Sequence, residues 1–154
     1  DRFNRVWGEA LRAGIAKRDS RLGPLQIFGD AQLAIGEGAE VMQAREAARN
    51  TIGFYVGGMG AKSKNYYNDL FRRYGWESEA EQIQDLFLSG KRAEAMAAVP
   101  DEYLDTANLI GTEAHIKERL GVYAAVGVSH LVVNPTGSRP LDDLAAVKSW
   151  MESR

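Results

Sequence analysis

The chain has 154 residues, of which 45% are apolar and 26% charged, with a formal net charge of −2 and a pI near 5.7. These values are typical of one soluble globular domain. Without a basic stripe they argue against a nucleic-acid partner. The absence of cysteine excludes disulfides, thiolate metal sites and a cysteine nucleophile, and it is compatible with the cytoplasmic location that we predict. No apolar run approaches the roughly 18 residues of a membrane span, so we expect no membrane partner.

Apolar spacing in the first two thirds of the chain predicts one strand followed by several helices. A charged loop follows the first helix, and the strand over residues 25–35 is interrupted at Gly29–Asp30, where the chain has a bulge or a short turn. Ser63 and Ser78 are the predicted N-caps of two helices, and a glycine run at residues 57–60 ends the helix before them. The predicted helices cover residues 3–17, 39–56, 64–74, 79–88 and 92–98, the last closed by Pro100.

The last third of the chain has the clearest pattern. Thr112 is the predicted N-cap of a helix that Gly127 stops, and a nearly all-apolar strand over residues 128–133 follows, which indicates a strand covered on both faces. A turn at residues 134–137 leads to a final helix over residues 141–151. A helix, a buried strand and a helix in succession indicate an α/β fold with parallel strands.

Two parallel strands alone do not form a stable sheet, so the sequence itself indicates that something is missing. We interpret residues 1–154 as a single partial domain with a helical insertion at about residues 39–104. The chain also starts at Asp1 without a methionine. We therefore expect it to be a piece of a longer protein.

Few motifs carry chemistry. The segment GGMGAKS at residues 57–63 lacks the glycine that a phosphate loop places directly before its lysine. It is either a helix stop or a loop that faces a cofactor or substrate. His130 is either an acid or base near the catalytic end of a barrel or a packed strand residue, and His115 is expected to be exposed. Two histidines at this spacing, without cysteine, predict no metal site.

Three segments carry a resemblance to a known family. They are AREAARNTIGFYVGGMGAKSKNYYNDLFRRYG at residues 44–75, VPDEYLDTANLIGT at residues 99–112 and ERLGVYAAVGVSHLVVNP at residues 118–135. The chain resembles the luciferase-like monooxygenases, in particular their F420-dependent oxidoreductase branch. The resemblance implies the C-terminal portion of a (β/α)8 TIM barrel. Residues 25–35 would be strand seven, residues 128–133 strand eight, and the helices between them an insertion.

The resemblance also implies a function. Family members transfer a hydride between a flavin or deazaflavin and a small organic substrate at the C-terminal mouth of the barrel. The cofactor would be coenzyme F420, with FMN as the alternative, and the missing N-terminal part would hold most of it. This chain would contribute one wall of the pocket for the cofactor and the small-molecule substrate. The residues predicted to line that pocket are Tyr55, Met59, Asn65 and Tyr66, none of them with a catalytic role.

The isolated chain is accordingly predicted to be inactive and to associate with itself or with the missing N-terminal half. A different class of function stays open, namely a stand-alone helical binding module without a redox cofactor. The surface of the strands distinguishes the two. A module needs polar faces on both strands, whereas a fragment leaves apolar strand faces uncovered or covered only by another copy. The apolar run Leu131–Val133 favours the fragment.

Overall fold

The computed structural model describes residues 2–153 as a three-stranded parallel sheet and eight helices. The helices are α1 (Arg2–Ala16), α2 (Ala39–Gly58), α3 (Tyr66–Arg73), α4 (Glu77–Leu88), α5 (Arg92–Ala97), α6 (Asp101–Ala107), α7 (Glu113–Ala125) and α8 (Pro140–Glu152). The strands are β1 (Phe28–Ile35), β2 (Leu109–Gly111) and β3 (His130–Pro135). The predicted α/β class is confirmed.

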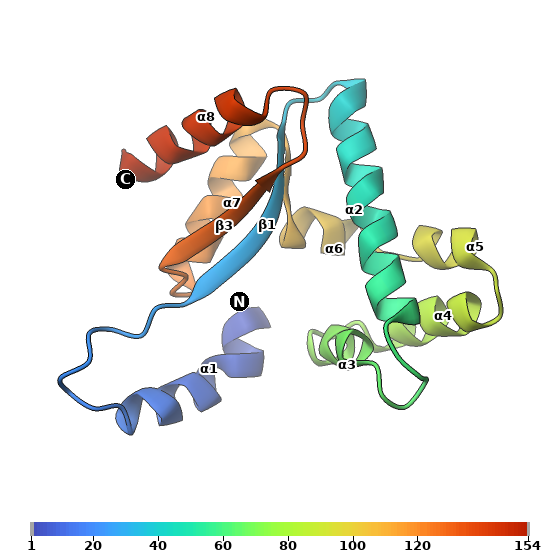
Figure 1. Cartoon of the computed structure of the whole chain (residues 1–154), viewed down its shortest axis with the longest axis horizontal. Coiled ribbons are helices and arrows are strands. Elements are labelled where there is room, and N and C mark those ends of the chain that lie inside the picture. The colour runs from blue at the N-terminus through green and yellow to red at the C-terminus, as the bar shows by residue number, and fades with distance from the viewer. Residues whose placement is uncertain (1, 154) are drawn as a thin grey trace.

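The sheet has the order β2-β1-β3 with every pair parallel. β3 pairs with β1 from Phe28 to Leu33, and β2 pairs only with the last three residues of β1. The carboxyl ends of all three strands therefore meet at one edge, which Figure 1 shows at the top of the sheet.

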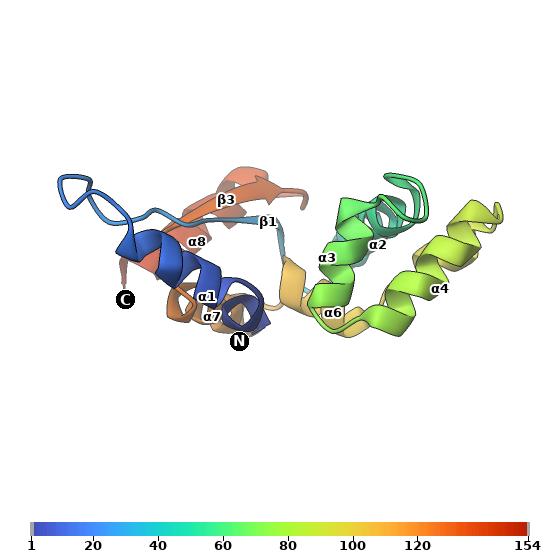
Figure 2. The same cartoon turned by 90° about the horizontal axis from the view of Figure 1, so that it is seen from below.

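Two apolar cores hold the chain together, and Figure 2 shows the two lobes that contain them side by side. In the first lobe, α7 and α8 cover one face of the sheet, where Leu33, Leu109 and Ile116 are fully buried. In the second lobe, helices α2 to α6 pack around buried Phe71, Ile83 and other apolar side chains. Ala34 and Ile110, near the ends of β1 and β2, belong to this second core and join the lobes.

On the opposite face of the sheet, no helix of residues 2–153 packs along β3. Exposed and half-buried residues alternate along β3, and Val132 is 53% exposed. The prediction of a strand covered on both faces is therefore wrong, because α7 and α8 lie on one side only. We call this surface the open sheet face. Its register pairs are Phe28 with His130, Asp30 with Val132, and Gln32 with Asn134.

The strands differ from the predictions in three ways. β1 starts only at Phe28 and runs through Gly29–Asp30 without interruption. β3 lies two residues later than predicted and includes Asn134 and Pro135, which the sequence assigned to a turn. β2 was not predicted, because three residues are too few for a periodic signal, and the helical segment after β1 consequently ends at β2.

Several helix ends also differ. α2 continues through Gly57 and Gly58. The Phe87 side chain of α4 packs so closely against both that a side chain at either position would not fit. Ser63 and Ser78 cap nothing: Asn65 is the N-cap of α3 and Trp76 precedes α4. The predicted cap at Thr112 is confirmed, since its hydroxyl accepts a hydrogen bond from the His115 amide.

Candidate functional site at the carboxyl edge of the sheet

Sites in parallel sheets form at the carboxyl ends of the strands, where the connecting loops meet. In this chain that edge is built from the loop between β1 and α2, the start of α7 after β2, and the loop between β3 and α8. The second and third of these loops begin directly after Gly111 and Pro135. The edge therefore gathers three segments that are far apart in the sequence (Figure 1).

The loop after β3 is fixed to β1 by hydrogen bonds. The Thr136 amide donates to the Leu33 carbonyl at 2.8 Å, and the Thr136 hydroxyl reaches the same oxygen at 3.3 Å. The Asp143 carboxylate, only 3% exposed, accepts a bond from the Ile35 amide at 3.2 Å. Gly137 packs so closely that a Cβ there would lie 2.9 Å from the Asp143 carboxylate. This wall of the site is thus held rigidly.

A hollow lies between this loop and the first turns of α2. Its volume is about 360 Å³, and we call it the α2 groove. The groove is lined by Glu40, Gln43, Ala44, Ala47, Thr136, Gly137 and Ser138. Hydroxyl, amide and carboxylate groups therefore converge on a hollow that lies at the edge where α/β proteins place ligands.

The open sheet face adds a buried polar atom near this edge. Gln32 follows Asp30 on that face and stands beside Asn134 of β3. Its side-chain oxygen is buried and has no hydrogen-bond partner among residues 2–153. Buried polar atoms are nearly always paired in native proteins. The amide of Gln32 is thus a group that the described part of the chain leaves unsatisfied.

Asn65, one of the four predicted pocket residues, is buried and forms hydrogen bonds within the protein. Its side chain is 1% exposed, and its oxygen accepts hydrogen bonds from the Tyr67 and Asn68 amides. Its NH₂ group donates to the carbonyls of Tyr55 and Val56 at 3.1 and 2.9 Å. Asn65 therefore caps α3 and ties it to the end of α2.

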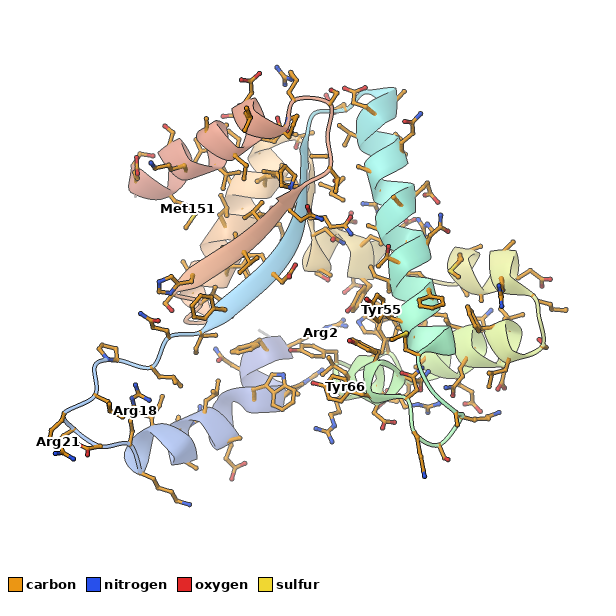
Figure 3. The ribbon with its side chains drawn as sticks, viewed as in Figure 1. Arg2, Arg18, Arg21, Tyr55, Tyr66 and Met151 are labelled. Carbon is orange, nitrogen blue, oxygen red and sulfur yellow. The ribbon has the colours of Figure 1, made fainter. Side chains whose placement is uncertain are left out.

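The other three predicted residues gather around this cap. Tyr66 and Met59 are largely exposed, and the Tyr55 and Tyr66 rings each contact Tyr67 edge-on. Figure 3 shows Tyr55 and Tyr66 together at the end of α2 opposite its junction with β1. Tyr55 stands 16 residues after Ala39, which corresponds to about 24 Å along a helix. The structure therefore brings the four residues together, at a distance from the carboxyl edge of the strands.

The two histidines also lie apart from each other. His130 begins β3, so it stands at the amino edge of the sheet, where its ring stacks on Phe28 with centroids 4.7 Å apart and bonds to the Ser129 hydroxyl at 3.0 Å. A mostly apolar cavity of about 200 Å³ lies beside it. This position at the amino edge argues against a catalytic role for His130. The prediction of a packed residue is not met either, because His130 is exposed. His115 is half-buried rather than exposed, and its Nε2 has no partner among the described residues.

Charged side chains outside the edge serve to join helices. Arg45 of α2 forms ion pairs with Asp101 and Asp105 of α6, and Arg49 reaches Asp101 at 2.6 Å and the Val99 carbonyl at 2.5 Å. These carboxylate contacts lower the pKa of Asp101 below its usual range, the hydrogen bond from Arg49 being the largest cause. Within residues 2–153 no group of three or more acidic or histidine side chains could hold a metal ion. None of the described helices combines the length and apolarity needed to cross a bilayer.

Comparison with known proteins agrees with the sequence patterns. Residues 2–130 match the family model described as luciferase-like monooxygenase. The chain belongs to the luciferase-like monooxygenase family. It is also 31% identical, over 144 residues, to a Mycobacterium tuberculosis protein provisionally named a coenzyme F420-dependent oxidoreductase. That alignment covers 92% of the chain and 41% of the relative, so the chain spans less than half the length of this relative. No solved structure matches the chain.

Sequence reasoning missed the residues of α2 that line the groove. Glu40 and Gln43 have the polar character of an ordinary exposed helix face. One signal was available: they lie in the first turns of the helix that directly follows a strand, where α/β proteins place ligand contacts. The other wall of the groove is formed by Thr136 and Gly137 of the predicted turn, together with Ser138.

Proposed function

We propose that this chain is the C-terminal part of a coenzyme F420-dependent oxidoreductase, with FMN as the alternative cofactor. The complete enzyme would transfer a hydride between the cofactor and a small organic substrate. The observation that carries the proposal is the family match over residues 2–130, together with the similarity to a relative named for F420.

The fold supports this proposal in one respect. β1 and β3 are parallel neighbours along six register pairs, as adjacent strands of a barrel must be, and α7 and α8 cover the face that would point outward. The open sheet face would then point into the barrel. Phe28 and Val132 on this face are 62% and 53% exposed, while the other four paired residues of the face are polar. The support for a fragment therefore comes from the strand pairing and from the partial coverage of the relative.

The position of β2 in the sheet limits which of the strands can be successive barrel strands. Three successive barrel strands would place β2 between β1 and β3, whereas β2 lies on the other side of β1. The proposal therefore assigns β1 and β3 to strands seven and eight and treats β2 as part of the inserted segment. The preceding strand would pair with the edge of β1 that β2 leaves free, from Phe28 to Gln32.

The residues at the carboxyl edge fit part of such a cofactor. The Gln32 amide, whose oxygen lacks a partner, and the Asn134 amide could hold the polar edge of a flat ring. The acidic residues Glu37 and Glu40, which follow the carboxyl end of β1, do not fit the cofactor's phosphates. The anionic part would therefore be held by the missing N-terminal portion. When bound, the cofactor supplies the hydride chemistry, while this chain orients the ring and closes one side of the pocket.

The test compares this chain with the product of its complete reading frame. Both proteins are assayed for reduction or oxidation of F420 and of FMN by the change in cofactor absorbance with a panel of alcohols and ketones. We expect turnover only with the complete product. Equal turnover by the isolated chain would refute its predicted inactivity. A complete product that neither binds nor turns over either cofactor would refute the function itself.

A further inference from the structure

The α2 groove is an open hollow at the carboxyl edge of the sheet, about 360 Å³ in volume. We propose that it binds the uncharged or cationic polar part of a small organic molecule and discriminates against anionic molecules. Its role as a substrate groove rests on the proposed function, which it deepens by naming the chemical class of the substrate. The argument uses the rigidity of the walls, the size of the hollow and the charge of its lining.

Both walls of the groove are preformed. The loop wall is held by the two Thr136 bonds to the Leu33 carbonyl and by the buried Asp143 carboxylate on the Ile35 amide. The helix wall is the beginning of α2, which Val41, Ala44 and Ala48 anchor in the second core. Because neither wall has to be ordered on binding, little of the interaction energy is lost to conformational entropy.

The size of the groove suits a small molecule. Its volume of about 360 Å³ lies at the lower end of the range of about 300–1,000 Å³ found for ligand pockets. Ala44 and Ala47 supply apolar surface, while Gln43, Thr136 and Ser138 supply an amide and two hydroxyl groups. A compact molecule with one apolar side and one hydrogen-bonding group therefore matches the lining.

The charge of the groove is acidic. Glu40 is the only charged residue among those that line it, and it forms no ion pair with any residue between 2 and 153. Its carboxylate folds back over Gly38 at the start of α2, where the helix dipole favours a negative charge. Arg139 follows the loop wall but does not line the groove. The helix end carries only about half a positive charge, so the full charge of the Glu40 carboxylate leaves the groove negative. An ammonium group is thus attracted to the groove and a carboxylate repelled.

Three probes that share one ring test this inference. The isotope-labelled chain is titrated with cyclohexylammonium, cyclohexanol and cyclohexanecarboxylate, and amide chemical shifts are followed by NMR. We expect saturable shifts at Gln43, Ala47 and Gly137. Cyclohexylammonium should bind roughly two- to fivefold more tightly than cyclohexanol, the range expected for one exposed charge pair, and cyclohexanecarboxylate most weakly.

Two variants show whether the preference comes from Glu40. Glu40→Gln should bring the affinities of all three probes to within about twofold, because it removes the charge and keeps the shape. Glu46→Gln is the matched control, since Glu46 lies on the same helix outside the groove and pairs with Arg49. This control should keep the wild-type preference.

Absence of shifts at the groove residues with every probe would overturn the inference. So would equal binding of the carboxylate and the ammonium, or a preference that survives Glu40→Gln. Each of these results leaves the proposed function standing if the complete product turns over F420 or FMN. Conversely, a charge-selective groove in a protein whose complete product shows no redox turnover would refute the proposed function and keep the groove as a binding site.

Discussion

Replacement of Asn65 tests whether this residue stabilises the fold or, as the sequence suggests, lines a ligand pocket. In Asn65→Ala, α3 loses its N-cap, which costs about 1 kcal/mol. The Val56 carbonyl keeps its bond from Asn68, but the Tyr55 carbonyl loses the only side-chain donor that reaches it from residues 2–153. Leaving this part-buried carbonyl without a partner costs about 1–3 kcal/mol. The expected loss in free energy of unfolding is therefore about 2–4 kcal/mol.

Urea unfolding followed by circular dichroism measures this loss, with Ser63→Ala as the control. Ser63 is the cap that the sequence suggests, but in the structure it caps nothing, so its replacement should cost less than about 0.5 kcal/mol. Asn65→Asp keeps the capping oxygen and loses both amide donors, so it should not restore stability. The reasoning is refuted if Asn65→Ala costs less than Ser63→Ala. It is also refuted if Asn65→Ala weakens ligand binding and leaves stability unchanged.

Two further predictions concern the second core. Gly57→Ala should destabilise the chain by about 1–3 kcal/mol, because the new Cβ would lie 2.7 Å from the Phe87 Cβ. Gly14→Ala, in a helix with open space around that position, should be neutral or stabilising. Thermal unfolding of both variants measures the difference, and equal effects would contradict this packing. Burial raises the pKa of Tyr103 from 10.0 to about 12. As the pH rises, the tyrosine therefore loses its proton in the unfolded chain before it does so in the folded one. The contribution of Tyr103 to the free energy of unfolding is present below pH 10 and is lost between about pH 10 and 12. Over this range the free energy of unfolding should fall by roughly 2–3 kcal/mol. In Tyr103→Phe the fall should be smaller by that amount. An unchanged pH profile in this variant would show that the tyrosine is not responsible.

The helices could be predicted because apolar residues recur at helical spacing against a common core. Thr112 could be recognised as a cap because its partner is only three residues away. Asn65 could not, because its amide also bonds to carbonyls at the end of another helix, and no local pattern contains that contact. Gly57 and Gly58 resembled a helix stop, but the close approach of Phe87 explains them, and that contact comes from tertiary packing.

One wall of the candidate site could be predicted from the sequence and the other could not. The turn after the last strand could be identified because sites follow the carboxyl ends of parallel strands. The partner wall could not be chosen from sequence, because Glu40 and Gln43 become groove residues only when α2 lies beside that loop. The three-residue strand β2 and the sheet order likewise depend on register between segments that the sequence does not pair.

The central claim is that the chain is the C-terminal part of a luciferase-like barrel oxidoreductase, and the reading frame upstream of the Asp1 codon tests it most directly. We predict that the frame continues without a stop codon through repeated strand–helix units long enough to supply the remaining barrel strands. A stop codon followed by a start site directly before Asp1 would contradict the claim and favour a small binding protein.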